Sequence, residues 1–357
     1  MKNFIKSILP LFYISFPTVL GLLVFSSNPE LTEKVYSDFL YVGITRIITF
    51  LFGWIPISIS ELLLVLLIPA LIFLIILVIL KRMKPLRGLY VLIFSLCTLF
   101  SWFYFSWGFN YLRQPMTERL AISSAVADST LIKQALQSEL DNANKSYLVY
   151  ANFDKEGIEA EIEKMYMIVE QQLGIKLPQG IRQPKKLQIH AILNKTMTSG
   201  IFSPFFHEVH VNQELLPIQY PIVLAHEKAH QMGIANEAEA NFLAYLVCTS
   251  SENPQLRYSA HFSQVSKLLR RAYTTIGDYN FYRQQVRPEI NADFKRVRDH
   301  WLKHAGIVAD FSHKAYDKYL KANRIKEGVK NYAGDIDMLI WWKLKKGNSV
   351  KNNRQER

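Results

Sequence analysis

Cysteine is scarce in this chain, with two among 357 residues. Cys97 lies inside an apolar run and Cys248 lies in a region that predicts a helix, so their number and placement exclude a disulfide framework. A cysteine-rich zinc site is excluded for the same reason. Histidine and carboxylate side chains are therefore the ligands that remain for a metal ion.

Acidic residues are fewer than basic ones: the chain has 30 Asp and Glu against 42 Lys and Arg, which gives a net charge of +12 and an isoelectric point of about 9.4. The basic residues are scattered along predicted helices and mixed with acids, which argues against a nucleic-acid partner. A solvated surface, or one that faces the headgroups of a lipid bilayer, fits this pattern better.

Charge is sparse in the first 111 residues, where long apolar runs predict a membrane domain. We expect three transmembrane helices, at about residues 8–25, 62–80 and 88–109. Residues 28–57 carry several charges and end in FGWIPI, and they predict an interfacial segment between the first two spans. A cleaved signal peptide is the alternative for the first run, but no small-x-small cleavage site follows it.

The basic residues beside the spans predict the orientation of the chain. Lys2 and Lys6 precede the first span, and the short loop KRMKPLR separates the last two. By the positive-inside rule both segments are cytoplasmic, and the two assignments agree only if the chain crosses the membrane three times. We therefore expect a multi-pass protein of the cytoplasmic (inner) membrane, with the remainder of the chain outside the cytoplasm.

Residues 112–342 predict a soluble domain that is mainly helical with a small sheet (α+β), and residues 343–357 predict a basic, disordered tail. Apolar periodicity indicates two or more helices before Gly174, which reads as a helix stop. LQIHAIL at 187–193 and EVHVN at 208–212 predict strands. The second of these directly precedes another predicted helix.

Residues 221–248, PIVLAHEKAHQMGIANEAEANFLAYLVC, contain His226, Glu227 and His230 in HExxH spacing. Residues four apart lie on the same face of a helix, so two imidazoles can bind one cation while the glutamate reaches a water molecule on it. This pattern predicts a zinc hydrolase. His226 and His230 bind Zn²⁺, and Glu227 is the general base that takes a proton from the water and later delivers it to the leaving amine.

Gly233 follows the motif and predicts a left-handed helix end, after which a second helix begins. Such a turn is where a catalytic zinc recruits its third ligand, and Asn236, Glu237 and Glu239 are the donors available. We favour Glu237, because a carboxylate is a better zinc ligand than an amide, and Glu239 is the alternative. Asn241, one turn later on the same face, is expected to support Glu237 by a hydrogen bond.

The spacing of Glu237, Ala240 and Asn241 resembles the ExxAD or ExxAN element that supplies the third zinc ligand in several glutamate-zincin families. With the three spans and GIFSPFFHEVHVN, the run resembles an uncharacterised bacterial family of integral-membrane proteins with an HExxH motif, a domain of unknown function. This resemblance covers nearly the full chain and implies a zincin-like fold. Asn241 replaces the Asp of the better-studied pattern. The short interval before Glu237 is similar to metzincin spacing, but Asn236 stands at the third histidine position, which leaves the clan open.

A peptidase also needs a donor for the developing oxyanion, which is usually Tyr, His or Arg. The candidates follow the HExxH motif in the chain, and the segment YDKYLKANRIKEGVKNY is richest in them. They are Tyr258, His261, Tyr316, Tyr319, Arg324 and Tyr332.

The sequence thus predicts a membrane-anchored zinc metallopeptidase that acts on a peptide or protein substrate in the envelope. Because no HExxH motif lies within a span, cleavage is expected at or near the membrane surface rather than inside the bilayer. Two alternatives remain open. One is a zinc-binding but non-catalytic membrane sensor or scaffold, and the other is a structural membrane protein in which HEKAH is only a charged helix face.

Overall fold

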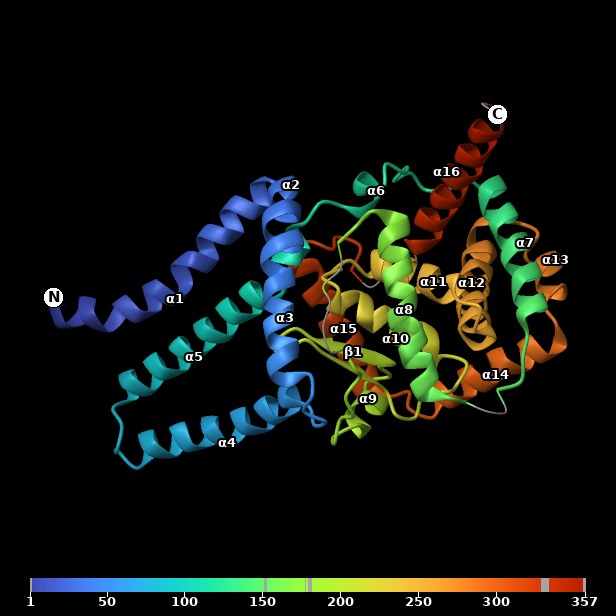
Figure 1. Cartoon of the computed structure of the whole chain (residues 1–357). Helices are drawn as coiled ribbons and strands as arrows, with labels where there is room; N and C mark the ends of the chain where they lie inside the picture. The colour runs from blue at the N-terminus through green and yellow to red at the C-terminus, as the bar shows by residue number, and fades with distance from the viewer. Residues whose placement is uncertain (1, 151–152, 177, 179–181, 329–333, 356–357) are drawn as a thin grey trace. The chain divides into compact units, whose positions relative to one another are not determined.

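The structure is a computed structural model that describes residues 2–150, 153–176, 178, 182–328 and 334–355. The described part is mostly helical and contains a two-stranded sheet (Figure 1). The chain divides into two compact units. The first unit consists of Met1–Gln114, Leu177–Gln188 and Phe202–His210, and the second consists of Pro115–Lys176, Ile189–Ile201 and Val211–Arg357.

Long apolar helices make up the first unit. In chain order they are α1 (Lys2–Ser27), α2 (Pro29–Leu31), the π-helical η1 (Thr32–Leu40), α3 (Tyr41–Phe52), α4 (Ile59–Ile79), α5 (Pro85–Ser106) and the 3₁₀ turn η2 (Gly108–Leu112). Ser58 caps α4, since its hydroxyl oxygen accepts a hydrogen bond from the backbone nitrogen of Glu61 at 3.0 Å. Pro85 begins α5, where the missing N–H of proline costs no helical hydrogen bond.

Four helical stretches of the described residues are long and apolar enough to cross a membrane. They are Leu9–Ser27, Pro29–Phe52, Ile59–Ile79 and Pro85–Ser106. The first, third and fourth coincide with the three predicted spans. The second covers the segment predicted to be interfacial, so the structure offers one more candidate span than the sequence analysis gives.

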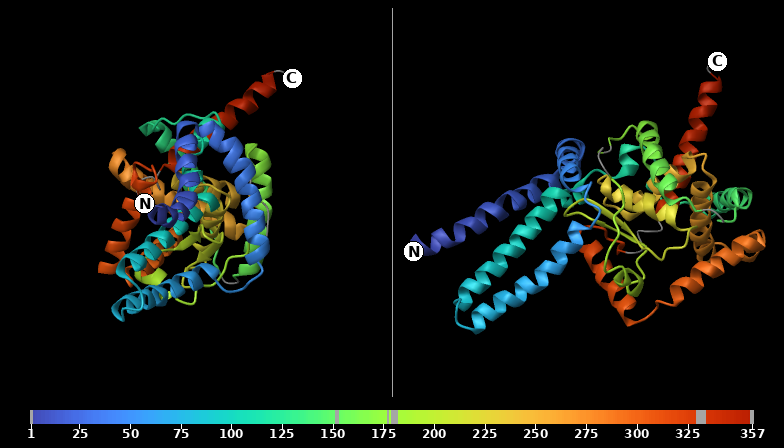
Figure 2. Two further views of the ribbon diagram at one scale, coloured as in Figure 1. Left: turned by 90° about the vertical axis from the view of Figure 1, so that its left-hand side faces the viewer. Right: turned by 60° about the horizontal axis from the view of Figure 1, so that its bottom comes forward.

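The stretch Pro29–Phe52 differs from the other three in direction and in burial. Helices α1, α4 and α5 extend the same way, whereas α3 runs across their ends (Figures 1 and 2). In this stretch 33% of residues are buried, against 11% or less in the others. The buried side of Pro29–Phe52 contacts the end of α5 and the residue after η2. The Tyr36 hydroxyl donates to the Phe105 carbonyl at 2.9 Å, and Glu33 forms a largely buried ion pair with Arg113.

The second unit is a helical bundle organised around one central helix. Its helices are α6 (Met116–Arg119), α7 (Ser129–Ser146), α8 (Lys155–Leu173), α9 (Ala191–Lys195), α10 (Tyr220–Gln231), α11 (Glu237–Ser250), α12 (Pro254–Thr275), α13 (Tyr279–Gln284), α14 (Pro288–Leu302), α15 (Ile307–Ala322) and α16 (Asp335–Gln355). Helices α8, α10, α12 and α16 all pack on α11. Ala240, Phe242 and Leu243 of α11 are fully buried, so this helix forms the centre of the core.

Helix ends in the second unit follow local sequence signals. Asp128, Asp154 and Asn253 each accept a backbone hydrogen bond at the start of α7, α8 and α12, respectively. Gly174 ends α8 with a left-handed backbone (φ +65°), as the sequence predicts.

The predicted small sheet is present as two paired strands, β1 (Gly200–Ser203) and β2 (Glu208–Val211). The strand expected at 187–193 is not formed: these residues make turns and enter α9, and the neighbouring Lys186 pairs with Ile57 in an isolated parallel bridge. A short apolar run such as LQIHAIL does not by itself distinguish strand from helix. Residues 343–355, expected within a disordered tail, continue α16 instead.

Candidate metal centre

Helix α10 presents the HExxH motif. Pro221 lies in its first turn, and the helix carries His226 and His230 one turn apart on the same face. Their Nε2 atoms lie 3.1 Å apart, and both side chains are largely buried. The two imidazoles therefore point at a common position.

A glycine turn directly after α10 orients His230. Gly233 has a left-handed backbone (φ +83°), which a residue with a Cβ adopts only with strain. The turn places the carbonyl of Ile234 at 2.7 Å from Nδ1 of His230. Because a carbonyl only accepts, Nδ1 carries a proton, and in the neutral tautomer of His230 Nε2 keeps the lone pair that a metal ion needs.

Helix α11 supplies the third group of the cluster. Asn236 caps this helix, its side-chain oxygen accepting from the backbone nitrogens of Ala238 and Glu239. Glu237 is thereby fixed as the first residue of α11 and is fully buried. Its Oε2 lies 3.2 Å from Nε2 of His226 and 3.4 Å from Nε2 of His230.

These three atoms fit the ligand set of a tetrahedral zinc ion. Zinc at about 2.0–2.1 Å from each ligand separates the ligand atoms by about 3.3 Å. The atoms of His226, His230 and Glu237 form a triangle with sides of 3.1, 3.2 and 3.4 Å. Two imidazole nitrogens and one carboxylate oxygen are also donors that zinc prefers. Among the described residues, these three are the group of His, Cys, Asp and Glu side chains whose ligand atoms lie close enough together to hold a metal ion.

The charges within this cluster are strongly coupled. Burial by itself lowers the pKa of His230, but the adjacent Glu237 carboxylate outweighs this effect and raises the pKa to about 9. Burial acts on Glu237 in the opposite direction, yet the two imidazoles hold the pKa of its carboxyl well below the ordinary value. Glu237 is therefore ionised at neutral pH, as a metal ligand must be.

Glu227 is buried beside the first residue of β1. A Cβ atom added at Gly200 would lie 2.7 Å from Cγ and 2.8 Å from Oε1 of Glu227. Such approaches are closer than van der Waals contact, so the glutamate packs directly on a backbone that has no side chain. Gly200 thus gives the predicted general base the room that it occupies.

The alternative ligands considered for the third position have other partners. Asn236 is used as the cap of α11. The Oε1 atom of Glu239 accepts from the backbone nitrogen of Met116 at 2.7 Å, and its Oε2 lies 3.7 Å from Arg119. Asn241 is half-buried one turn after Glu237, and its supporting role stays a prediction.

One of the oxyanion candidates contacts the cluster directly. The hydroxyl of Tyr316, on α15, donates to Oε1 of Glu237 at 2.6 Å, and the ring of Tyr319 stacks on that of Tyr316. Tyr258 donates to Asp293 instead. Arg324 has an exposed side chain just after α15, and Tyr332 lies outside the described residues.

His261, another candidate, belongs to a separate buried cluster around Glu139. The carboxylate of Glu139 accepts from Nδ1 of His261 at 2.8 Å, from the Tyr245 hydroxyl at 2.7 Å and from Nζ of Lys343 at 2.5 Å. Burial raises the pKa of Glu139, but His261 and Lys343 outweigh it and lower the pKa to about 2. This cluster joins α7, α11, α12 and α16.

Sequence reasoning missed two residues that hold α10 in place. Lys228, inside the HExxH motif, is fully buried and pairs with Glu163 of α8. Tyr166 of α8 donates its hydroxyl hydrogen to the carbonyl of Ala225. Both residues fix the helix that carries the two histidines. The apolar periodicity of the sequence gives a core-facing position for Tyr166 but not for Lys228.

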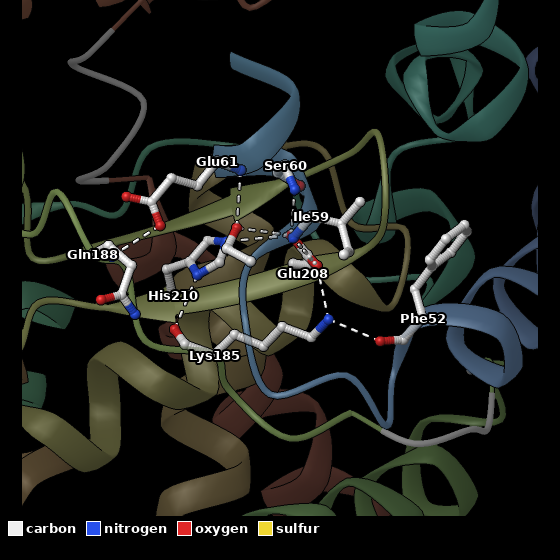
Figure 3. A network of polar contacts seen from close by, with 9 residues as sticks. Phe52, Ile59, Ser60, Glu61, Lys185, Gln188, Glu208 and His210 are labelled. Atoms are coloured by element: carbon white, nitrogen blue, oxygen red, sulfur yellow. Dashed lines mark hydrogen bonds and ion pairs between the residues drawn. The ribbon is translucent and has the colours of Figure 1, made fainter. Parts of the chain in front are cut away.

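A second polar network, in the first unit, was also not foreseen (Figure 3). The buried carboxylate of Glu208 accepts from the backbone nitrogens of Ile59 and Ser60 at 3.0 and 2.9 Å, from the Ser58 hydroxyl at 3.0 Å and from Lys185 at 2.8 Å. Glu208 therefore serves as the anion at the N-terminus of α4.

The two histidines beside this network are structural. Nδ1 of His210 donates to the Lys185 carbonyl at 2.9 Å, and Nε2 of His207 donates to the Ser106 carbonyl at 3.1 Å. Burial lowers the pKa of both, that of His207 to about 4. Both residues belong to the first unit, whereas the His–His–Glu cluster belongs to the second.

The fold is thus a helical chain with several N-terminal helices suited to a membrane and a buried cluster of two histidines and a glutamate. The chain belongs to the family described as "Protein of unknown function (DUF3810)", which matches residues 36–340. The match includes the whole cluster. No curated protein and no solved structure matches the chain.

Proposed function

We propose that this protein is a membrane-anchored zinc metallopeptidase. The observation that carries the proposal is the triangle formed by His226, His230 and Glu237, whose sides of 3.1 to 3.4 Å suit a tetrahedral zinc face. Glu227 lies on the same helix between the two histidines, and its buried carboxylate supports the role of general base.

Zinc bound by these three side chains would supply a Lewis acid that lowers the pKa of water to about 7. The chain supplies the proton transfers. Glu227 accepts a proton from the attacking water and returns it to the leaving amine. Glu237 stays ionised and the Nδ1–H of His230 stays bound to Ile234, so the ligand atoms keep their orientation.

Strand β1 offers a way to place an extended peptide. Among the described residues β1 pairs with β2 on one side and has no strand partner on the other. A substrate that added to this edge by main-chain hydrogen bonds would pass Gly200, against which Glu227 packs. The absence of a side chain at Gly200 keeps the base close to that main chain.

We further propose three transmembrane helices, α1, α4 and α5, with the second unit outside the cytoplasm. The crossing direction of α3 and its larger buried share favour an interfacial position for this helix (Figure 1). With three spans, Lys2 and the basic loop at 81–84 lie on the same side of the membrane. A fourth span would place them on opposite sides.

Labelling with a membrane-impermeant thiol reagent tests this topology. In spheroplasts, a cysteine at the exposed Val126 should react, and a cysteine at Met83, in the basic loop, should react only after lysis. Equal labelling of both positions, or the reverse pattern, would contradict three spans.

The variant Glu227→Gln tests the activity. It is expected to retain zinc and to lose hydrolysis, because the amide cannot accept the proton. Comparing the envelope proteomes of cells with the wild type and with Glu227→Gln should show a substrate that accumulates uncleaved in the variant. Hydrolysis by the variant would refute the mechanism. Bound zinc without any difference in cleavage would instead favour a zinc-binding sensor or scaffold.

A further inference from the structure

Helix α15 has an inner face that contacts the candidate metal centre. Only Ala309 and Leu320 of its 16 residues are buried. Tyr316 lies on the same side of the helix as these two, and its hydroxyl reaches Oε1 of Glu237 at 2.6 Å. The helix thus buries few of its residues, and its Tyr316 hydrogen-bonds to a predicted zinc ligand.

The outer face of α15 is apolar and exposed. Val308, Phe311, Ala315 and Tyr319 follow at helical spacing and form one stripe. The exposed fractions of three of them are 52% for Val308, 73% for Phe311 and 39% for Tyr319. Ile307, at the start of the helix, is 87% exposed. Large side chains rarely gather in this way on a surface that faces only water.

Basic side chains border this stripe on one side. Lys314 and Lys318 are exposed, and by helical spacing they lie next to the apolar arc. An aromatic and aliphatic face flanked by lysines is the composition of helices that lie in the plane of a lipid surface. Each cation near anionic headgroups contributes about 1 kcal/mol to binding at the membrane surface. A purely apolar peptide partner would not require lysines beside the stripe.

We propose that α15 is an interfacial helix whose outer stripe inserts among the headgroups of an anionic lipid bilayer while its inner face holds Glu237 through Tyr316. The stacking of Tyr319 on Tyr316 connects the two faces. Contact with lipid orders the helix and, with it, the hydrogen bond to Glu237. The second half of this proposal rests on the proposed zinc site, and the first half does not.

The lipid contact is tested with the full chain in vesicles. Nitroxide labels are placed at position 311 on the stripe and at position 310 on the polar side, in a Cys97→Ser background; Cys248 is fully buried and does not react. Collisions with oxygen and with a water-soluble nickel chelate report the depth of each label. A label at Phe281, an exposed apolar residue of α13, is the control for hydrophobicity alone.

The label at 311 should be reached by oxygen and protected from the chelate in vesicles of phosphatidylcholine and phosphatidylglycerol, and this protection should decrease in phosphatidylcholine alone. The labels at 310 and 281 should remain open to the chelate. Equal access at 310 and 311 would overturn the proposal. A label at 311 that neither reagent reaches would indicate packing on protein and would also overturn the proposal. The same holds for a label at 311 that is protected only when an apolar peptide is added.

The link to the metal site is tested by zinc titration in the same vesicles. The variant Val308→Asp/Phe311→Asp should bind zinc about 10-fold more weakly, as expected on losing an outer partner of a ligand. Unchanged affinity would overturn the link. If the wild type binds no zinc, the proposed function fails, whereas the depth of the label at 311 still decides the lipid contact.

Discussion

The hydroxyl of Tyr316 lies 2.6 Å from Oε1 of Glu237, on the oxygen opposite to the one that faces the two histidines. One carboxylate is therefore held from α15 through one oxygen, while its other oxygen faces the two histidines and the zinc position that we propose. An outer partner of this kind fixes the direction of a ligand lone pair and raises the affinity for the ion.

Replacing Tyr316 with Phe removes this hydrogen bond and keeps the ring. The variant is expected to bind zinc about 10-fold more weakly, because Glu237 loses the group that orients it. Competition with a fluorescent chelator measures the change. Tyr319→Phe is the matched control on the same helix and should leave the affinity unchanged. An equal loss in both variants would point to a general loosening of α15.

Adding a methyl group at Gly200 is expected to displace Glu227. The new Cβ would lie 2.7 Å from Cγ of the glutamate, so the side chain has to move. A shift of about 1 Å in a catalytic group costs about 100-fold in rate. Gly200→Ala should therefore lower turnover of any substrate identified while the zinc content stays the same. Gly277→Ala, where a Cβ meets nothing within 4 Å, is the control.

Neutralising Glu208 is expected to destabilise the first unit. Glu208→Gln leaves the ammonium of Lys185 buried without its counter-charge, which costs about 3 kcal/mol. The melting temperature of the solubilised full chain should fall clearly. Glu30→Gln, which breaks the exposed pair with Lys34 in the same unit, should have almost no effect. Adding Lys185→Met to Glu208→Gln should recover part of the loss, and a further drop would contradict this account.

The Glu139 cluster predicts a dependence of stability on pH. The pKa of this carboxyl is about 2 in the folded chain and 4.5 ordinarily, so the folded state binds the proton less tightly. The stabilisation, about 3 kcal/mol, is complete above the ordinary pKa and is lost as the pH falls through the folded value.

The comparison of wild type with Glu139→Gln tests this prediction. The gap between their melting temperatures should narrow as the pH is lowered from about 5 to about 3. Glu252→Gln, at a fully exposed side chain, is the control and should show no such change. A gap that stays constant with pH would mean that the carboxylate charge does not contribute.

Local signals in the sequence predicted the parts of the site that lie close together in the chain. The HExxH spacing, the left-handed turn at Gly233 and the choice of Glu237 over Glu239 all concern residues 226–239, where helix geometry and one short turn decide which side chains meet. The strand at 208–211 and the stop at Gly174 were predictable for the same reason.

Contacts between distant segments were not predictable in this way. Tyr316 and Glu237 are 79 residues apart, and Ser58 and Glu208 are 150 apart. Nothing in the residues themselves indicates which pair will meet, because tertiary packing selects it. The direction of α3 across the ends of α1, α4 and α5 depends likewise on packing within the first unit, and its apolar composition alone resembles a span.

The glycine turn between α10 and α11 has a consequence for how the chain folds. All three metal-facing side chains fall between His226 and Glu237, so the loop that an ion must close is short and its entropic cost is small. The complete set is present as soon as residue 237 has emerged, ahead of most of the helices that cover it. Under the proposed function, zinc bound by this set would nucleate the α10–α11 hairpin, which is the centre of the second unit, early in folding.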